Sequence, residues 1–143
     1  MRVIITAGGT GGHIYPAIAI INKIKEMDST SEFIYIGTHN RMEKDIIPTL
    51  GIKYVPLEIY GLSTSIKLMP RNVKNIFLIK KAIKKCISIM KEFKPDIVIG
   101  VGGYVTYPVI VAANKCHIKT FIHEQNSIPG KSNRALAKRV NKI

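Results

Sequence analysis

The 143-residue sequence contains no tryptophan, only two cysteines and only nine acidic residues. Cys86 and Cys116 have no CxxC spacing and cannot cross-link a small secreted scaffold, so both are expected to be reduced and buried, as in a cytosolic protein. No apolar run approaches the roughly 18 residues of a membrane-spanning helix. The opening MRVIITAGG has neither the length nor the cleavage site of a signal peptide. We therefore expect neither a disulfide-rich secreted protein nor an integral membrane protein.

The shortage of acidic residues leaves a net charge of +13, because 22 residues are lysine or arginine. The excess is uneven: residues 1–60 are neutral overall, residues 61–94 carry +8 and residues 95–143 carry +5. Such asymmetry is typical of a protein that meets a polyanion, which can be nucleic acid, an anionic membrane or a phosphorylated ligand. A lysine-rich surface that is merely solvated is the alternative.

Short apolar runs alternate with segments of helical period along the whole chain. The apolar runs predict strands at residues 3–7, 33–37, 52–59, 96–100 and 119–123. Helical spacing predicts helices at residues 13–27, 41–50, 72–93, 108–115 and 132–140, with a loop at residues 61–70. This alternation favours a parallel sheet covered on both faces, so we expect a doubly wound, Rossmann-like α/β domain. Residues 140–143 look like the approach to a sixth strand, so the chain is expected to be a piece of a longer protein.

Two glycine-rich turns each follow a predicted strand and precede a predicted helix. The first, GGTGG, spans residues 8–12, and the second, GGY, spans residues 102–104. Glycine lets the backbone approach a ligand closely, and a helix N-terminus offers unpaired N–H groups that favour phosphate. Because ligands bind at the carboxyl ends of parallel strands, both turns are expected to face one crevice. Tight turning without a ligand is the alternative.

The glycine spacing argues against two common phosphate ligands. No lysine follows the glycines as it does in the P-loop of nucleotide hydrolases. Ile14 occupies the third glycine position of the dinucleotide fingerprint, and Gly37-Thr38 ends the second strand without the acidic residue that would hold a ribose. NAD binding and P-loop hydrolysis are therefore both disfavoured.

The polar cluster His123-Glu124-Gln125-Asn126 follows the fifth predicted strand. Its position suits recognition of a sugar or an acid–base role, and a polar loop tucked against the sheet is the alternative. His13 lies at a helix start, where a lone histidine is more often a structural hydrogen-bonder than a catalyst. His39 and His117 stand alone and are expected at the surface, so no metal site is predicted.

The helix predicted at residues 72–93 has an apolar face and a lysine face. Val73 and Phe77 fall among the lysines, on the side away from the core. Exposed apolar residues ringed by basic ones fit a surface that dips into an anionic bilayer. Nucleic acid is not expected, because no helix-turn-helix, zinc-finger, RRM or KH pattern occurs. The expected membrane-contact residues are Ile66, Lys67, Met69, Arg71, Val73, Lys74, Phe77, Lys81 and Lys84.

Three motifs in order closely resemble the MurG glycosyltransferase family: AGGTGGHIYPA at residues 7–17, GVGGYVTYP at residues 100–108 and HEQN at residues 123–126. The segment GTHNRME at residues 37–43 is also similar to the family's second strand and loop. The resemblance covers the whole chain and implies a GT-B glycosyltransferase, in which two α/β domains face each other across a cleft. Residues 1–143 would form the amino-terminal acceptor- and membrane-binding domain, and the carboxy-terminal donor-binding domain would be absent.

The resemblance implies a peptidoglycan-synthesis enzyme acting peripherally at the cytoplasmic face of the cell membrane, without cofactor or metal. It would transfer N-acetylglucosamine from UDP-N-acetylglucosamine, with inversion, to lipid I (undecaprenyl-pyrophosphoryl-MurNAc-pentapeptide), giving lipid II. Since the missing domain holds most donor contacts in the family, this chain alone is expected to be inactive. One alternative is the acceptor- and membrane-binding subunit of a split N-acetylglucosamine transferase. Another is a non-enzymatic module that binds a membrane or nucleic acid.

The resemblance also assigns roles by motif position. His13 and Glu124 would lie near the chemistry, with His13 preferred as the group that takes the acceptor's proton. The implied donor contacts are Thr10, Gly11, Gly12 and Asn126. The full set of implied substrate-binding residues is Thr10, Gly11, Gly12, Gly102, Gly103, Tyr104, Gln125 and Asn126.

Overall fold

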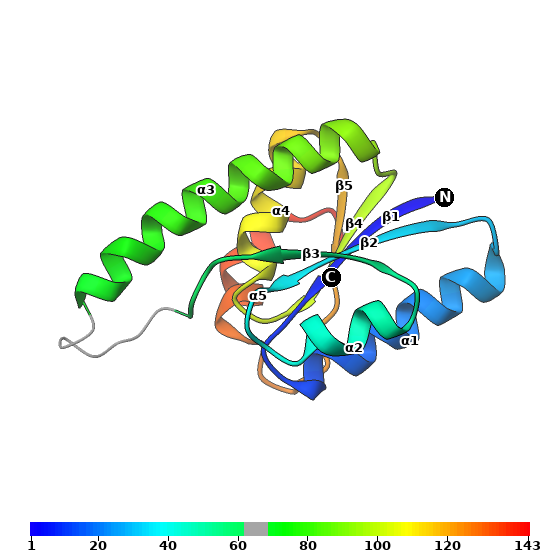
Figure 1. The fold of residues 1–143 in the computed structure, drawn as a ribbon, viewed down its shortest axis with the longest axis horizontal. Coiled ribbons are helices and arrows are strands. Elements are labelled where there is room, and N and C mark those ends of the chain that lie inside the picture. The colour runs from blue at the N-terminus through cyan, green and yellow to red at the C-terminus, as the bar shows by residue number, and fades with distance from the viewer. Residues whose placement is uncertain (62–68) are drawn as a thin grey trace.

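The computed structural model of the chain describes residues 1–61 and 69–143. Five strands form one parallel sheet in the order β3-β2-β1-β4-β5, with helices on both faces (Figure 1). The strands are β1 (Arg2–Ala7), β2 (Glu32–Thr38), β3 (Lys53–Leu57), β4 (Ile97–Gly102) and β5 (Lys119–Ile122). The helices are α1 (Gly11–Met27), α2 (Glu43–Thr49), α3 (Met69–Phe93), α4 (Thr106–Lys115) and α5 (Lys131–Leu136). This strand order is the doubly wound arrangement, so the expected fold class is confirmed.

Each face of the sheet has its own apolar core, because alternate residues of a strand point to opposite faces. Ile4 of β1 belongs to the core beneath α3, α4 and α5, together with Cys86 of α3 and Leu136 of α5. Ile5, the next residue, belongs to the core beneath α1 and α2, together with Ile14 of α1. The sheet is therefore a buried layer, and the loops at the carboxyl ends of its strands are left to carry function.

The long helix α3 confirms the predicted division into an apolar and a basic face. The apolar residues assigned to its inner face are buried or half-buried, and all the lysines of its outer face are exposed. Burial raises the pKa of the Cys86 thiol to about 12. Cys116, expected to be buried as well, is only half-buried. The amino-terminal end of α3 projects past the edge of the sheet (Figure 1).

Four helices, α1, α3, α4 and α5, begin one to three residues earlier than predicted, and prolines explain the differences at α3 and α4. α3 begins at Met69 rather than at residue 72, and α4 begins at Thr106 rather than at residue 108. Pro70 and Pro108 lie in the first turns, where their missing N–H groups would have no helical partner in any case. The prolines therefore belong inside the helix starts and not to the preceding loops.

The carboxy-terminal residues are less regular than predicted. α5 ends at Leu136, and a short 3₁₀ turn at Ala137–Arg139 follows it, so the helix expected to reach residue 140 is shorter. The expected approach to a sixth strand is present as a parallel bridge between Phe121 and Lys142. Within residues 1–61 and 69–143, none of the helices combines the length and the apolarity needed to cross a bilayer.

Candidate functional site

The loops that follow β1, β4 and β5 meet at the carboxyl edge of the sheet. The Gly8 amide donates a hydrogen bond to the Gly102 carbonyl at 3.3 Å, which joins the two glycine-rich turns. The Gln125 side-chain amide donates to the Gly12 carbonyl at 2.8 Å, which joins the HEQN loop to the start of α1. The two glycine-rich turns therefore lie side by side at this edge, and the polar cluster lies beside them.

Close packing explains the glycines of the second turn. Gly102 has φ of +118° and Gly103 has φ of +85°, in the region that side chains rarely adopt. A Cβ at Gly102 would overlap the imidazole of His13, and a Cβ at Gly103 would overlap the backbone carbonyl of Gly8. Only glycine at both positions lets the second turn rest on the first turn and on the His13 ring.

His13 stands in the first turn of α1, half-buried at the point where the loops meet. Its Nδ1 lies 3.2 Å from the hydroxyl of Thr10. The N-cap residue Thr10 makes no side-chain capping bond, and the first turn of α1 holds no acidic residue. Thr10 therefore leaves the amide groups of the helix N-terminus uncapped, while the Glu43 carboxylate accepts from the Gly9 amide just before them.

Glu124 organises the loop between β5 and α5. One carboxylate oxygen accepts hydrogen bonds from the backbone amide and side chain of Asn126, at 3.0 and 2.8 Å. The other accepts from the Gly130 amide and from Asn133 Nδ2, both at 2.9 Å. Partial burial opposes ionisation, but these hydrogen bonds outweigh it and lower the pKa of Glu124 to about 2. So acidic a group is a weak proton acceptor at neutral pH.

His13 and Glu124 line one small cavity of about 150 Å³, together with Gly102 and Gly103. Lys131 adds a positive charge to its rim. Asn133 also lines this cavity, is only 6% exposed, and has an Oδ1 that accepts no hydrogen bond within the described part of the chain. An unpaired buried acceptor is costly, so a ligand hydroxyl or amide that donated to it would be favoured.

Asn133 and Glu43 are two site residues that sequence reasoning missed. Asn133 had no signal, because only folding brings it beside Glu124. Glu43 ends the GTHNRME segment and is fully buried beneath the first glycine turn. Its carboxylate accepts from the amide and hydroxyl of Thr38 at 3.0 and 2.6 Å, and from the Gly9 amide at 3.4 Å. The first turn is therefore anchored from below by a buried anion.

Glu43 also affects two tyrosines. Burial and the negative charge of Glu43 raise the pKa of Tyr35 and of Tyr54, so both phenols stay protonated. They can therefore donate to backbone carbonyls, Tyr35 to Ala7 and Tyr54 to Thr38, at 3.1 and 2.5 Å. These bonds fix the ends of β1 and β2 under the first turn.

Of the eight predicted substrate-binding residues, Gly102 and Gly103 line the small cavity and the other six do not. Asn126 uses its side-chain amide within its own loop, on Glu124. Tyr104 packs beside Gly61 and lines a different, larger cavity. Thr10, Gly11, Gly12 and Gln125 surround the amino-terminal end of α1, as expected from their positions.

The expectation that His39 and His117 stand alone at the surface is only partly confirmed. His117 is exposed, as predicted. His39 does not stand alone: its Nδ1 lies 3.2 Å from the Leu57 carbonyl and its Nε2 lies 3.3 Å from the hydroxyl of Tyr60. Among the described residues, no group of three or more His, Cys, Asp or Glu side chains could hold a metal ion.

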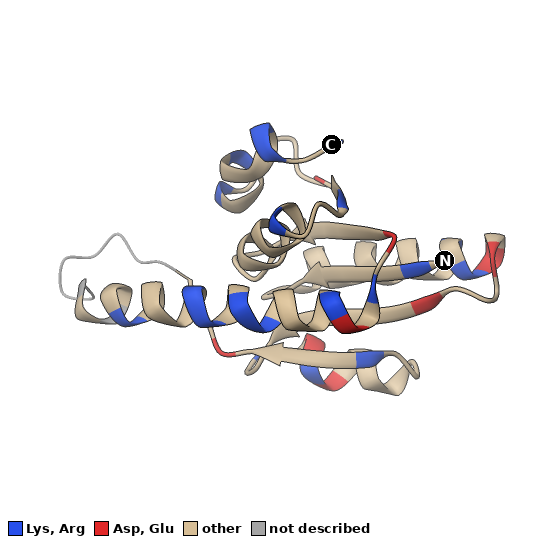
Figure 2. Cartoon of the chain, turned by 90° about the horizontal axis from the view of Figure 1, so that it is seen from above, with Lys and Arg blue, Asp and Glu red and all other residues tan. Residues whose placement is uncertain are grey.

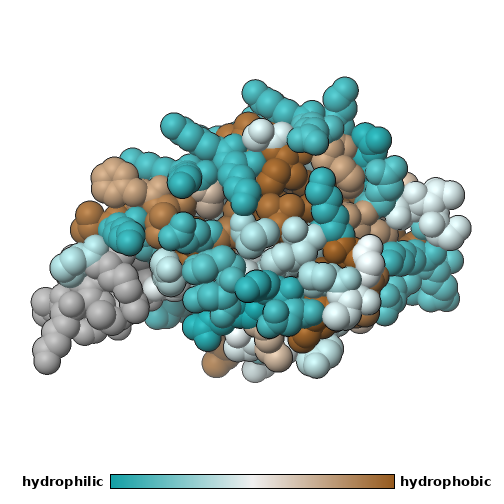
Figure 3. Space-filling view, viewed as in Figure 1, coloured by the Kyte–Doolittle hydropathy of each residue, from teal (hydrophilic) through white to brown (hydrophobic). Residues whose placement is uncertain are grey.

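The outer face of α3 mixes lysines with exposed apolar side chains. Val73, Ile76 and Phe77 are 52%, 49% and 67% exposed. Blue turns follow one another along α3 in Figure 2, and brown and tan atoms lie among teal ones over its amino-terminal half in Figure 3. Lys74, Lys81 and Lys84 are exposed as expected. Ile66, Lys67 and the side chains of Met69 and Arg71 lie outside the described residues.

The family model described as the glycosyltransferase family 28 N-terminal domain matches residues 3–143. Two curated relatives are named UDP-N-acetylglucosamine–N-acetylmuramyl-(pentapeptide) pyrophosphoryl-undecaprenol N-acetylglucosamine transferase. The one from Bacillus pumilus is 50% identical over 143 residues, and the one from Alkaliphilus oremlandii is 52% identical over 145 residues. The matches cover all of this chain but only 39% and 38% of those relatives.

Solved structures agree with this assignment. The crystal structure of Acinetobacter baumannii MurG is 30% identical with a TM-score of 0.84, over 98% of this chain and 40% of that one. A UDP-GlcNAc 2-epimerase from Neisseria meningitidis is 21% identical with a TM-score of 0.57, over 85% of this chain and 32% of that one, and shares the fold alone. The chain thus spans about two fifths of the length of its MurG relatives. It belongs to glycosyltransferase family 28, as the match to that family's N-terminal domain shows.

Proposed function

We propose that the chain is the amino-terminal part of an inverting glycosyltransferase that acts at the cytoplasmic face of the cell membrane. The complete protein transfers N-acetylglucosamine from UDP-N-acetylglucosamine to lipid I and thereby makes lipid II. The names of the relatives support this donor, this acceptor and this reaction class. Because the chain spans about two fifths of those relatives, it supplies only one wall of the active site.

The observation that carries the proposal is the junction of three loops around His13. Two glycine-rich turns and the HEQN loop meet beside the uncapped N-terminus of α1. Helix N-termini and glycine-lined backbone favour phosphate groups, and both substrates carry a diphosphate. Thr10, Gly11 and Gly12 are the residues best placed to meet such a group.

His13 is the proposed general base. In an inverting transfer, the acceptor hydroxyl attacks the anomeric carbon, its proton passes to the base, and UDP leaves with the electrons of the broken bond. Thr10 engages Nδ1 of His13, which leaves Nε2 as the ring nitrogen for the acceptor hydroxyl. Glu124 is the weaker candidate, because its low pKa makes it a poor proton acceptor. Its role in the proposal is to hold the loop that carries Gln125 and Asn126.

The outer face of α3 is the proposed membrane contact. Val73, Ile76 and Phe77 insert among lipid acyl chains while the neighbouring lysines meet anionic headgroups. Ile66, Lys67, Met69 and Arg71, which precede these residues in the sequence, complete this surface in the proposal. This placement brings a membrane-bound acceptor to the edge of the sheet where the loops meet.

A sugar-transfer assay on a lipid I analogue tests the proposed reaction. The chain alone should give no transfer and little affinity for UDP-N-acetylglucosamine, whereas adding a separately supplied carboxy-terminal domain should restore transfer. His13→Ala should abolish the restored activity, while Met27→Ala, at the far end of α1, should not. Micromolar binding of the donor by the chain alone would contradict the proposal that the carboxy-terminal domain holds most of the donor contacts.

Vesicle co-sedimentation tests the membrane contact. Phe77→Gln should reduce binding to anionic vesicles about 30-fold, because an aromatic side chain buried in lipid contributes roughly 2 kcal/mol. Met27→Gln, an exposed apolar residue remote from α3, serves as the matched control. Unchanged binding by the Phe77 variant would mean that the lysines act alone.

Natural separation into two subunits is the second candidate. The chain spans about two fifths of the relatives' length, a share that fits one domain of either a single polypeptide or a split enzyme. A split transferase would regain activity with its natural partner polypeptide, and the reading frame downstream of residue 143 distinguishes the two cases. A continuous frame would exclude the split enzyme.

A further inference from the structure

An apolar cavity of about 420 Å³ lies near the site, between α3, α4 and α5. Its volume lies in the range of about 300–1,000 Å³ that is typical of small-molecule pockets. Three of the chain's six tyrosines line it, together with aliphatic side chains and one lysine. The lining residues are Ile59, Tyr60, Gly61, Ile79, Tyr104, Tyr107, Lys131, Ser132 and Ala135.

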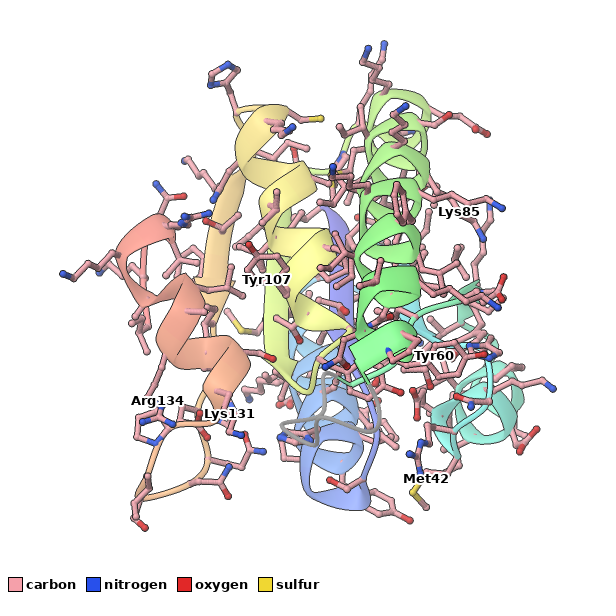
Figure 4. All side chains as sticks on the ribbon, turned by 90° about the vertical axis from the view of Figure 1, so that its left-hand side faces the viewer. Met42, Tyr60, Lys85, Tyr107, Lys131 and Arg134 are labelled. Carbon is pink, nitrogen blue, oxygen red and sulfur yellow. The ribbon has the colours of Figure 1, made fainter. Side chains whose placement is uncertain are left out.

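The wall formed by Tyr60 is fixed before any ligand arrives. Asn75, only 1% exposed, accepts from the Tyr60 amide at 2.8 Å and donates to the Tyr60 carbonyl. The Tyr60 ring packs edge-on against His39, with centroids 5.2 Å apart. In Figure 4, Tyr60 lies at the foot of α3, Lys131 at the start of α5, and Tyr107 on α4 between those helices. The cavity is therefore preorganised by buried polar contacts.

The two ends of the cavity face different chemistry. At one end, Lys131 and Ser132 line both this cavity and the small cavity of His13 and Glu124. At the other end, Ile79 lies one helical turn from the exposed Ile76 on α3. Cationic and polar groups thus lie toward the loop junction, and apolar groups lie toward the proposed membrane contact.

From this arrangement we infer that the cavity holds the first isoprene units of a polyprenyl-diphosphate-linked acceptor. An amphiphile with an anionic head and an apolar chain matches the order of groups from Lys131, past the tyrosines, to α3. The inference rests on the proposed function, because the relatives' names give pyrophosphoryl-undecaprenol as part of their substrate. It adds that the chain of the lipid is bound by protein next to its diphosphate, before it enters the membrane.

Comparison of two soluble probes tests the inference on this chain. Farnesyl diphosphate carries a short isoprenoid chain, and inorganic pyrophosphate carries none. Farnesyl diphosphate should bind at least about tenfold more tightly, because apolar burial favours it. Ala135→Phe, which fills the cavity, should remove this advantage and leave pyrophosphate affinity unchanged. Ala19→Phe, on the exposed face of α1, is the matched control and should keep the advantage.

A photoreactive diazirine on the chain end of the farnesyl probe gives a second readout. Cross-links should map to the segments around Tyr60, Tyr104 and Ala135. Equal affinity for the two probes, or cross-links confined to the outer face around Phe77, would overturn the inference.

Failure of the proposed function has a different signature. It would appear as absent sugar transfer in the reconstituted enzyme. A reconstituted enzyme that transfers sugar but shows no farnesyl advantage would overturn only the inference.

Discussion

The two glycine-rich turns occupy equivalent places after β1 and β4, but their glycines face different surroundings. At Gly102 and Gly103, an added Cβ would overlap His13 and the Gly8 carbonyl. At Gly9 an added Cβ would meet nothing within 4 Å, and at Gly12 only the Thr10 hydroxyl at 3.8 Å. The second turn is therefore filled by the protein itself. In the first turn Gly8 is packed as well, since an added Cβ would lie 2.6 Å from the Glu43 carboxylate, but Gly9 and Gly12 leave open space beside a helix N-terminus. The second turn thus serves packing, whereas part of the first turn stays accessible.

Gly103→Ala, in the packed second turn, should destabilise the fold more than any other proposed substitution. The new Cβ must overlap the Gly8 carbonyl in a backbone with φ of +85°, so the free energy of unfolding should fall by at least about 3 kcal/mol. Gly51→Ala separates the two causes, since Gly51 has φ of +69° but open space around it, and should cost only about 1 kcal/mol. Urea denaturation measures both. Equal losses would mean that backbone strain alone explains the glycine at position 103.

Glu43→Ala should have the next largest effect, because it removes the anchor that only the first turn has. The Thr38 amide, the Thr38 hydroxyl and the Gly9 amide would lose their acceptor in a buried place. Leaving such donors unpaired should lower the free energy of unfolding by about 2–3 kcal/mol in urea denaturation. Glu58→Ala, an exposed glutamate after β3, is the control and should change it by less than about 0.5 kcal/mol.

The difference between the turns marks the limit of what the sequence predicts. Strand and helix order follow from apolar periodicity, and the glycine turns and HEQN cluster could be placed at one edge because parallel strands end together. Which glycines pack and which stay open could not be predicted, since that depends on the approach of His13 and Gly8 from other segments. Glu43 and Asn133 were missed for the same reason: each acquires its role from a partner loop.

The start of α3 was missed for a local reason. Pro70 was read as ending a loop, although a proline in the first turn of a helix costs no hydrogen bond. The sequence also could not predict that the Tyr104 side chain packs toward the apolar cavity, because its contact residue Gly61 is distant in sequence. Side-chain direction at loop ends is set by such tertiary contacts, which periodicity does not contain.

Gly12→Ala tests the open part of the first turn, because it should weaken pyrophosphate binding without destabilising the fold. An added methyl group has room in the folded chain, and alanine favours helix, so the free energy of unfolding should change by less than about 1 kcal/mol. The same methyl group would stand where a phosphate approaches the N-terminus of α1. Pyrophosphate affinity, measured by calorimetry, should therefore fall about tenfold or more. Unaltered affinity would place the anion away from the first turn.

Protonation of Glu124 should have the smallest effect on the free energy of unfolding. Glu124 holds the HEQN loop, which contacts the first glycine turn through Gln125. Hydrogen bonds lower the pKa of Glu124 from 4.5 to about 2 despite its partial burial. Since the folded pKa lies below the unfolded one, the carboxylate stabilises the fold above about pH 4.5, and this contribution is lost as the pH falls toward 2.

The difference in unfolding free energy between the wild-type chain and Glu124→Gln should therefore shrink over this range. Asp28, whose pKa is also lowered by hydrogen bonds from Thr30, is present in both proteins and cancels in the difference. A carboxyl titration of Glu124 by NMR gives the same quantity directly. A midpoint near 4.5 would show that the bonds from Asn126, Gly130 and Asn133 do not hold the loop in solution.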